Sequence, residues 1–159
     1  MPQRDLPAVD GPSARTRRAG VSDSTRSLMK LARASAGGAL ALAAAQTVDM
    51  RLTGRQGSDT PVRAFEALTR HRVRNDAEGA AVGYSVQSCL APLGAVAALR
   101  AGERVTRRFG AAFLAPLVFV GVVGPALGAS AWPWHWTRND WTRELTLKSV
   151  LAIAIIAAL

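Results

Sequence analysis

Six ionisable residues lie at the edges of long apolar stretches, where acid–base chemistry could occur: Asp49, Arg51, Arg55, Asp140, Glu144 and Lys148. We refer to these six as the polar cluster. Side chains of both signs at such positions can form ion pairs, handle protons or hold a charged ligand, and ionisable residues within membrane segments are functional candidates by default. The polar cluster is therefore the candidate site in this sequence.

The second half of the polar cluster has helical spacing. Glu144 and Lys148 are four residues apart with the acid first, the order that suits an ion pair on one helix face. Asp140, one turn earlier, can cap or begin that helix. If the first and last helices meet the same interface, Asp49 and Arg51 can reach this face. The alternative is that Lys148 extends outward to the interface while Glu144 lies among lipid headgroups.

Other chemical motifs are missing from the sequence. It contains no Gly-rich phosphate loop, no Cys-x-x-Cys pair and no supported Ser, His and Asp arrangement. Cys89 is the only cysteine, and His71 and His135 are far apart without a second ligand at metal-site spacing. We therefore predict no metal and no cofactor, and the sequence favours a non-enzymatic protein.

Long apolar blocks determine the expected fold. The chain has 159 residues, of which 49% are hydrophobic, and these are gathered into four blocks at about 31–50, 79–99, 109–132 and 141–159. A helix of about 20 apolar residues crosses the hydrocarbon layer of a membrane. We therefore predict an all-α integral membrane bundle of four transmembrane helices. For the first block, a cleaved signal peptide is the alternative, because "ALALAAAQ" offers small residues for cleavage.

The segments outside these blocks are polar. Residues 1–27 mix Pro, Gly, Ser and Arg without periodicity, which predicts a flexible basic tail before a transmembrane domain at 28–159. In the first loop, "SDTP" resembles a capped helix start, and Val62, Phe65 and Leu68 then share one face. This pattern predicts an amphipathic helix that lies in the headgroup region.

Glycines and prolines in the central blocks predict close packing and bending. Gly79-x-x-x-Gly83 and Gly124-x-x-x-Gly128 place small residues on one helix face, where neighbouring backbones can approach closely, although glycine can equally be filler. Three prolines lie within the same blocks and are expected to bend the helices: Pro92, Pro116 and Pro125.

The charge distribution indicates lipid rather than nucleic acid as the partner. The formal net charge is +9, and the arginines lie between apolar blocks, where they can meet anionic headgroups. The tail together with residues 100–108 is more basic than the first and third loops, which predicts a cytoplasmic N-terminus of a multi-pass protein in a bacterial cell membrane. An aromatic belt is expected at the opposite interface: Trp132, Trp134, Trp136 and Trp141.

Two short patterns resemble those of a group of uncharacterised small actinobacterial integral membrane proteins with four predicted spans. The first pattern follows the Gly/Ala-rich block and consists of Asp49, Met50, Leu52, Gly54, Arg55, Ser58 and Pro61. The second opens the last block and consists of Trp136, Asp140 and Trp141. In that group an acid and a Pro-His pair follow, whereas this chain has Glu144, Leu147 and Lys148 there. The departure puts a proton-handling role at these positions in doubt.

These observations favour a non-enzymatic integral membrane protein that is a structural or accessory component of a membrane complex. Membrane lipids with anionic headgroups, and other membrane subunits, are the expected partners. A small-solute or proton transporter or channel is the alternative, because of the polar cluster. A lipid-modifying enzyme would depend only on Asp49, Asp140 and Glu144 sharing one interface.

Overall fold

The computed structural model of the chain describes the backbone of residues 14–54 and 60–159 and the side chains of residues 24–54 and 60–159. Every regular element within these residues is a helix, as the apolar blocks predict. The longer helices are α1 (Ala14–Thr53), α2 (Thr60–Thr69), α3 (Asp76–Ser88), α4 (Leu90–Arg100), α5 (Val105–Val118) and α7 (Arg138–Ala158). Three short elements complete the chain: the π-helix η1 (Phe119–Val123), α6 (Gly124–Ala126) and the 3-10 helix η2 (Pro133–His135).

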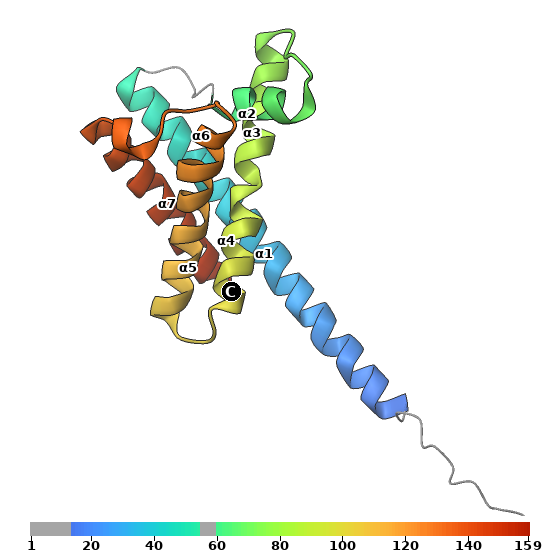
Figure 1. The fold of residues 1–159 in the computed structure, drawn as a ribbon. Coiled ribbons are helices and arrows are strands. Elements are labelled where there is room, and N and C mark those ends of the chain that lie inside the picture. The colour runs from blue at the N-terminus through green and yellow to red at the C-terminus, as the bar shows by residue number, and fades with distance from the viewer. Residues whose placement is uncertain (1–13, 55–59) are drawn as a thin grey trace, which may run out of the picture.

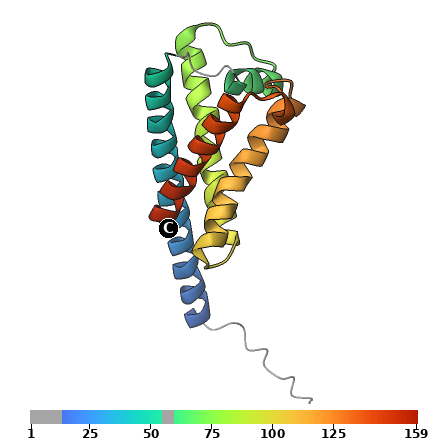
Figure 2. The same ribbon diagram turned by 90° about the vertical axis from the view of Figure 1, so that its left-hand side faces the viewer.

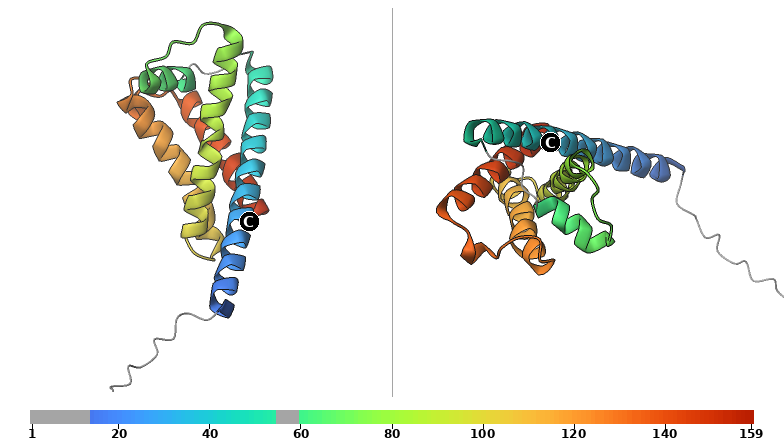
Figure 3. Two further views of the ribbon diagram at one scale, coloured as in Figure 1. Left: turned by 90° about the vertical axis from the view of Figure 1, so that its right-hand side faces the viewer. Right: turned by 90° about the horizontal axis from the view of Figure 1, so that it is seen from above.

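Four rods form the bundle: α1, α3 with α4, α5 with η1 and α6, and α7 (Figure 1). The start of α1, the α4–α5 turn and the C-terminus lie toward one end, and α2 and η2 lie at the other (Figures 1 and 2). Helix α1 packs against α7 and α4, and α5 packs against α4 and α7. Viewed from above, α1 runs along one side of the other three rods (Figure 3). We call the α2 and η2 end the site end.

Helix α1 is longer than the sequence predicts. It begins at Ala14, so residues 14–27 are helical rather than part of a flexible tail, and the first part of the predicted tail, residues 1–13, lies outside the described residues. The N-terminal part of the helix projects past the bundle (Figure 1), and all side chains from Ser24 to Lys30 are exposed. Adding residues to an existing helix costs far less than nucleating a new one, so the packed part of α1 can extend into polar sequence.

Two helical segments are long and apolar enough to cross a membrane: Asp76–Arg100, which includes α3 and α4, and Val105–Ala126. The prediction of four spans is not confirmed, because α1 and α7 do not reach this level. In α7, Arg143, Glu144 and Lys148 occupy the first half, and α1 is rich in alanine and glycine and carries Gln46 within its apolar part. Small and charged residues together lower the hydropathy of these two helices.

The third span ends earlier than predicted. The block at 109–132 is helical only to Ala126, and the chain then turns at Gly128, whose φ of 69° lies in the left-handed region. Ala129 donates its backbone N–H to the Gly124 carbonyl at 3.0 Å, and Gly128 donates to the Pro125 carbonyl at 2.9 Å. This pattern is a Schellman cap, which glycine forms without steric cost. Trp132 therefore lies in a connection outside the helix.

Two of the three prolines lie close to an interruption of the regular helix, whereas Pro116 lies within α5. Pro125 has no N–H, so the Gly121 carbonyl loses its i+4 partner, and the π-helix η1 precedes this proline directly. Pro92 lies near the start of α4, and the α3–α4 rod is interrupted at Cys89 just before it. Residues next to both interruptions, Leu90 and Val123, line the cavity described below.

The close helix contacts involve different glycines from those that the spacing suggests. A Cβ on Gly83 would be 4.0 Å from Val62 Cγ2, and one on Gly128 would meet nothing within 4 Å, so neither pattern joins two rods of the bundle. Instead, a Cβ on Gly38 would lie 2.9 Å from Ile155 Cγ1, and one on Gly94 would lie 2.9 Å from Ile155 Cδ1. Helices α1, α4 and α7 therefore approach closely around Ile155, which is fully buried.

Candidate functional site

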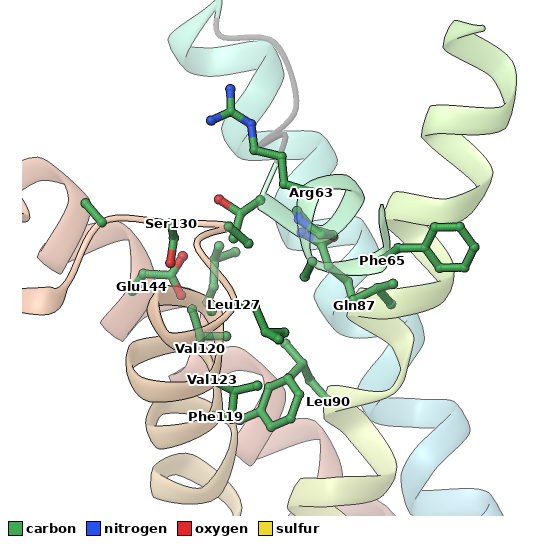
Figure 4. A pocket seen from close by; sticks show the side chains of 18 of the residues that line it. Arg63, Phe65, Gln87, Leu90, Phe119, Val120, Val123, Leu127, Ser130 and Glu144 are labelled. Carbon is green, nitrogen blue, oxygen red and sulfur yellow. The ribbon is translucent and has the colours of Figure 1, made fainter. Parts of the chain in front are cut away.

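A cavity of about 540 Å³ opens in the bundle at the site end. It is bounded by α1, α2, the α3–α4 rod, η1 with the segment after it, and α7, and it contains both apolar and polar side chains (Figure 4). Away from the site end, the bundle is filled by a core of small and aliphatic side chains that includes Ala91, Ala95, Leu151 and Ile155. The cavity therefore belongs to one half of the bundle.

One side of the cavity is apolar. It includes Leu90 on α4 and Phe119, Val120 and Val123 on η1. Figure 4 shows Leu90 and Phe119 extending toward one another from their two rods. Phe119 is 40% exposed, so this side of the cavity is not sealed by packed side chains.

Helix α7 brings an ion pair to the opposite side. Lys148 Nζ donates to Glu144 Oε2 at 2.9 Å, and the Lys148 side chain is only 3% exposed, whereas that of Glu144 is 24% exposed. The lysine side chain thus points inward. The sequence left open whether Lys148 pairs with Glu144 or extends outward to the interface, and in the structure the two residues are paired. A buried ammonium needs an anionic partner because desolvation disfavours its charge.

A second ion pair joins α7 to α1. Arg143 Nε lies 2.6 Å from Asp49 Oδ2, and both side chains are about a quarter exposed. The two atoms are themselves buried, and their orientation does not make a directed hydrogen bond, so the contact is electrostatic. Asp49, the acid at the end of the Ala-rich run, therefore neutralises an arginine of the last helix.

Asp140 belongs to the start of α7. Thr137 is the N-cap residue, and its hydroxyl accepts from the Asp140 N–H at 3.2 Å, while Asp140 Oδ2 accepts from the Thr137 N–H at 2.9 Å. This reciprocal arrangement is a capping box, which satisfies free N–H groups at a helix start. The sequence predicts a capping role for Asp140, and this geometry agrees with it.

Two buried uncharged groups at the cavity have no hydrogen bond to the described part of the chain. Gln46 on α1 is 8% exposed, and no hydrogen bond joins its side-chain amide to described residues. Ser130 Oγ is buried without a partner among them. A Cβ on Gly124 would come within 2.8 Å of this hydroxyl, so glycine makes room for it. Buried polar groups are normally satisfied, and such exceptions are places where a water or ligand binds.

A second cavity, of about 670 Å³, lies next to the first. The two share Gln46, Pro61, Arg63, Gln87 and Arg143, so these residues form the boundary between them. The second cavity is more polar because the loop between α2 and α3 contributes to its wall.

Two carboxylates hold that loop in place. Glu66 Oε1 accepts from the Val73 N–H at 2.9 Å, and Glu78 accepts from the Arg74 N–H at 2.8 Å and contacts His71 Nε2 at 3.0 Å. The loop is therefore fixed by its own side chains, which positions α2 across the site end.

The structure thus brings four of the six polar-cluster residues to one region, but in separate arrangements. Glu144 and Lys148 form a pair within α7, and Asp49 pairs with Arg143, which is not among the six. Arg51 is exposed on α1, and Arg55 lies outside the described residues. A single network of all six is therefore not observed.

Sequence reasoning missed Arg143 and Gln46. The Ala-rich run at 34–48 contains three polar residues, Ser35, Gln46 and Thr47, and Gln46 is the only amide among them. An amide inside an apolar helix is a signal that could have identified Gln46. Arg143 carries no local signal, because its partner is almost a hundred positions away in the chain.

The four tryptophans gather at the site end in two pairs. Trp132 and Trp134 stack with ring centroids 4.8 Å apart, and Trp136 and Trp141 lie 5.0 Å apart at a tilted angle. Trp136 also donates its Nε1–H to the Ala131 carbonyl at 2.9 Å and lines the first cavity. The other three are exposed, and their role as interface anchors remains a prediction.

The site combines a cavity, two ion pairs and polar side chains without a hydrogen bond to the described part of the chain. Within the described residues, no three His, Cys, Asp or Glu side chains come together in a way that could hold a metal ion. Comparison of the chain with protein families, with curated proteins and with solved structures gives no match. The geometry of the cavity and of the outer surface is therefore the basis for any functional proposal.

Proposed function

We propose that the protein is a non-enzymatic integral membrane protein that serves as an accessory component of a membrane complex. The observation that carries this proposal is the outward-facing apolar surface. In each of the two apolar segments, only 28% of the most apolar window is buried inside the bundle, and large side chains such as Leu93, Leu114, Val118 and Val122 are exposed. A soluble protein rarely exposes a continuous apolar surface of this kind.

All four rods cross the membrane in this proposal. The antiparallel order of the rods supports it, because the connections alternate between the two ends of the bundle. The charges of α7 and of the end of α1 are compatible with it, since Lys148 and Arg143 are both paired. Exposed basic residues at the end opposite the site end, including Arg104 and Arg107, would face the cytoplasm and its anionic headgroups.

This arrangement predicts which positions label from the same side. After replacement of the exposed Cys89 by serine, single cysteines at Arg72 and Asn139 should react with an impermeant maleimide from one side of the cell membrane. A cysteine at Glu103 should react only from the other side, because the α4–α5 turn is at the opposite end. Reaction of Arg72→Cys and Glu103→Cys from one side would contradict the four-rod topology.

The accessory role predicts a stable partner. Purification of the tagged protein in a mild detergent should retain at least one other membrane protein in a fixed ratio, because the exposed small and apolar faces of the rods can pack against another helix. Substituting Leu114 and Val118 together by alanine should reduce the partner's yield without changing the amount of this protein in the membrane. A preparation that contains only this chain and lipid would contradict the accessory role.

A small-solute transporter is the second candidate, and one observation favours it: a buried ion pair lines a cavity within the bundle. Ionisable groups inside membrane proteins often mark transport pathways. The packed core beyond the cavity would have to open for transport. Solute flux in vesicles that contain the purified protein alone, abolished by Lys148→Met, would favour this candidate over the accessory role.

A further inference from the structure

We propose that the cavity at the site end binds an uncharged amphiphile, with a head group rich in hydroxyls and a single hydrocarbon chain, such as a monoacylglycerol. The inference rests on the proposed membrane location, since such a ligand would come from the lipid phase. Its chemistry follows from three features of the wall: the charges, the neutral polar groups and the apolar side.

Four of the five charged residues that line the cavity have a partner among the described residues, and the fifth, Arg63, is not without one. Lys148 is paired with Glu144 at 2.9 Å, Arg143 with Asp49 at 2.6 Å, and Asp140 is part of the capping box with Thr137. A ligand with a net charge would leave one charge in this low-dielectric region without a partner, or would have to separate an existing pair. The inner wall therefore favours a ligand without net charge.

Besides the two atoms of the Asp49–Arg143 contact, two buried neutral groups at the cavity make no hydrogen bond to the described residues. The Gln46 amide offers two N–H donors and a carbonyl acceptor, and the residue as a whole is 8% exposed. Ser130 Oγ can donate and accept, and it is also buried without a partner in the described residues. A hydroxyl group on a ligand can likewise donate and accept, so a diol or polyol could satisfy both. A purely apolar ligand would leave them unsatisfied at a cost in affinity.

The remaining wall suits a hydrocarbon chain. Leu90, Phe119, Val120, Val123 and Leu127 line the cavity below the polar groups, and Leu90 and Phe119 reach toward one another there (Figure 4). Phe119 is 40% exposed, so this side of the cavity is open, and in this proposal the hydrocarbon chain of the ligand enters here from the lipid. The cavity volume of about 540 Å³ lies within the range of known small-molecule sites, roughly 300–1,000 Å³.

The test uses the full-length protein in lipid nanodiscs and a monoacylglycerol that carries a photoreactive diazirine on its chain. We expect saturable crosslinking, with labelled peptides from η1 and from α4. Unlabelled monoacylglycerol should compete for the site. Oleate and lysophosphatidate, with the same chain but an anionic head, should compete at least about tenfold less well, which corresponds to roughly 1.4 kcal/mol. Hexadecane should not compete.

Variants connect the binding to the proposed residues. Gln46→Leu and Ser130→Ala should each weaken competition by monoacylglycerol about tenfold, as expected for a lost hydrogen bond to a buried group. Ser85→Ala is the matched control, because Ser85 on α3 is exposed and its hydroxyl donates to the Ala81 carbonyl at 2.8 Å, away from the cavity. Val123→Trp places a large side chain in the cavity and should abolish labelling. Its elution volume in size-exclusion chromatography and its melting temperature should stay the same, which shows that the variant is folded and has lost only the binding.

Three results would overturn the inference: crosslinks spread evenly over the outer apolar surface, stronger competition by the anionic amphiphiles, or labelling that Val123→Trp leaves unchanged. Each of these could occur while the cysteine-labelling topology is as proposed. Rejection of the ligand site by one of these results would then leave the proposed membrane location standing. Failure of the topology, in contrast, would remove the lipid route into the cavity.

Discussion

Replacing Glu144 by glutamine is expected to lower the free energy of unfolding more than any other single charge removal in the bundle. The change leaves the Lys148 ammonium, which is 3% exposed, without an anionic partner. Breaking a buried ion pair by removing one member typically costs about 3–5 kcal/mol, because the other charge stays in a low dielectric. Thermal unfolding in detergent or nanodiscs, followed by tryptophan fluorescence, measures the loss.

The reverse change should be milder, and the asymmetry is part of the prediction. Lys148→Met leaves Glu144 unpaired, but that side chain is 24% exposed at the cavity, where water can reach it. The double variant removes both charges and should recover part of the stability lost in Glu144→Gln, since replacement of a whole buried pair by neutral groups is often tolerated. Glu103→Gln, at an exposed position in the α4–α5 turn, is the control and should change little.

Equal and strictly additive losses in the two single variants would contradict this account. They would mean that the two charges do not interact, as in the alternative where Lys148 extends outward to the membrane surface. The Lys148→Met variant also bears on the transporter candidate when its solute flux is measured. If its thermal stability equals that of the double variant and its flux equals that of the native protein, the ion pair is structural.

Part of this site was accessible from the sequence because it depends on local spacing. Glu144 and Lys148 form their pair within one helix, so their four-residue separation offered the pair as one of two interpretations. The same holds for Asp140, whose capping role depends on residues three positions away. The Asp49–Arg143 pair depends on how α1 and α7 cross, and no local pattern in either segment encodes the crossing.

The same distinction applies to the fold. The apolar blocks predict where helices occur, since a helix is stabilised by neighbours along the chain. The early end of the third helix was harder to predict, because Pro125 and Gly128 are both tolerated within membrane helices. In the structure the helix ends between these two residues, where the chain turns at the site end. The cavity follows from side chains on five separate elements, so its volume and polarity required the tertiary structure.

Glycine positions illustrate the limit most clearly. The Gly-x-x-x-Gly spacing identified Gly79, Gly83, Gly124 and Gly128, none of which lies between two rods of the bundle. Gly94 does lie there, although its neighbours at the same spacing are not glycines: Leu90 precedes it and Ala98 follows it. A helix face can approach another through glycine and alanine combined, and which face does so depends on what the partner helix presents.

Substitution of Gly94 by alanine is therefore expected to destabilise the protein, even though alanine is the better helix former. The new Cβ would lie 2.9 Å from Ile155 Cδ1 and 3.0 Å from the Ala112 carbonyl oxygen, so α4 would have to move away from α5 and α7. Overpacking of this kind costs about 1–3 kcal/mol. The apparent melting temperature should fall by roughly 2–4 °C for each kcal/mol in a chain of this size.

Two companion variants separate this crowding from a general effect of glycine replacement. Ile155→Val removes the Cδ1 atom that alanine would meet, so Gly94→Ala should cost less in the Ile155→Val background than in the native protein. Gly110→Ala, in α5, adds a methyl group where nothing lies within 4 Å, and it should stabilise by about 0.5–1 kcal/mol because alanine favours the helix. If Gly94→Ala lowers the free energy of unfolding, Gly110→Ala raises it, and Ile155→Val reduces the loss caused by Gly94→Ala, then α4, α5 and α7 must meet around Ile155. Stabilisation by both alanines would mean that these helices are farther apart, and the cavity beside them would then lose the wall that Leu90 and Phe119 provide.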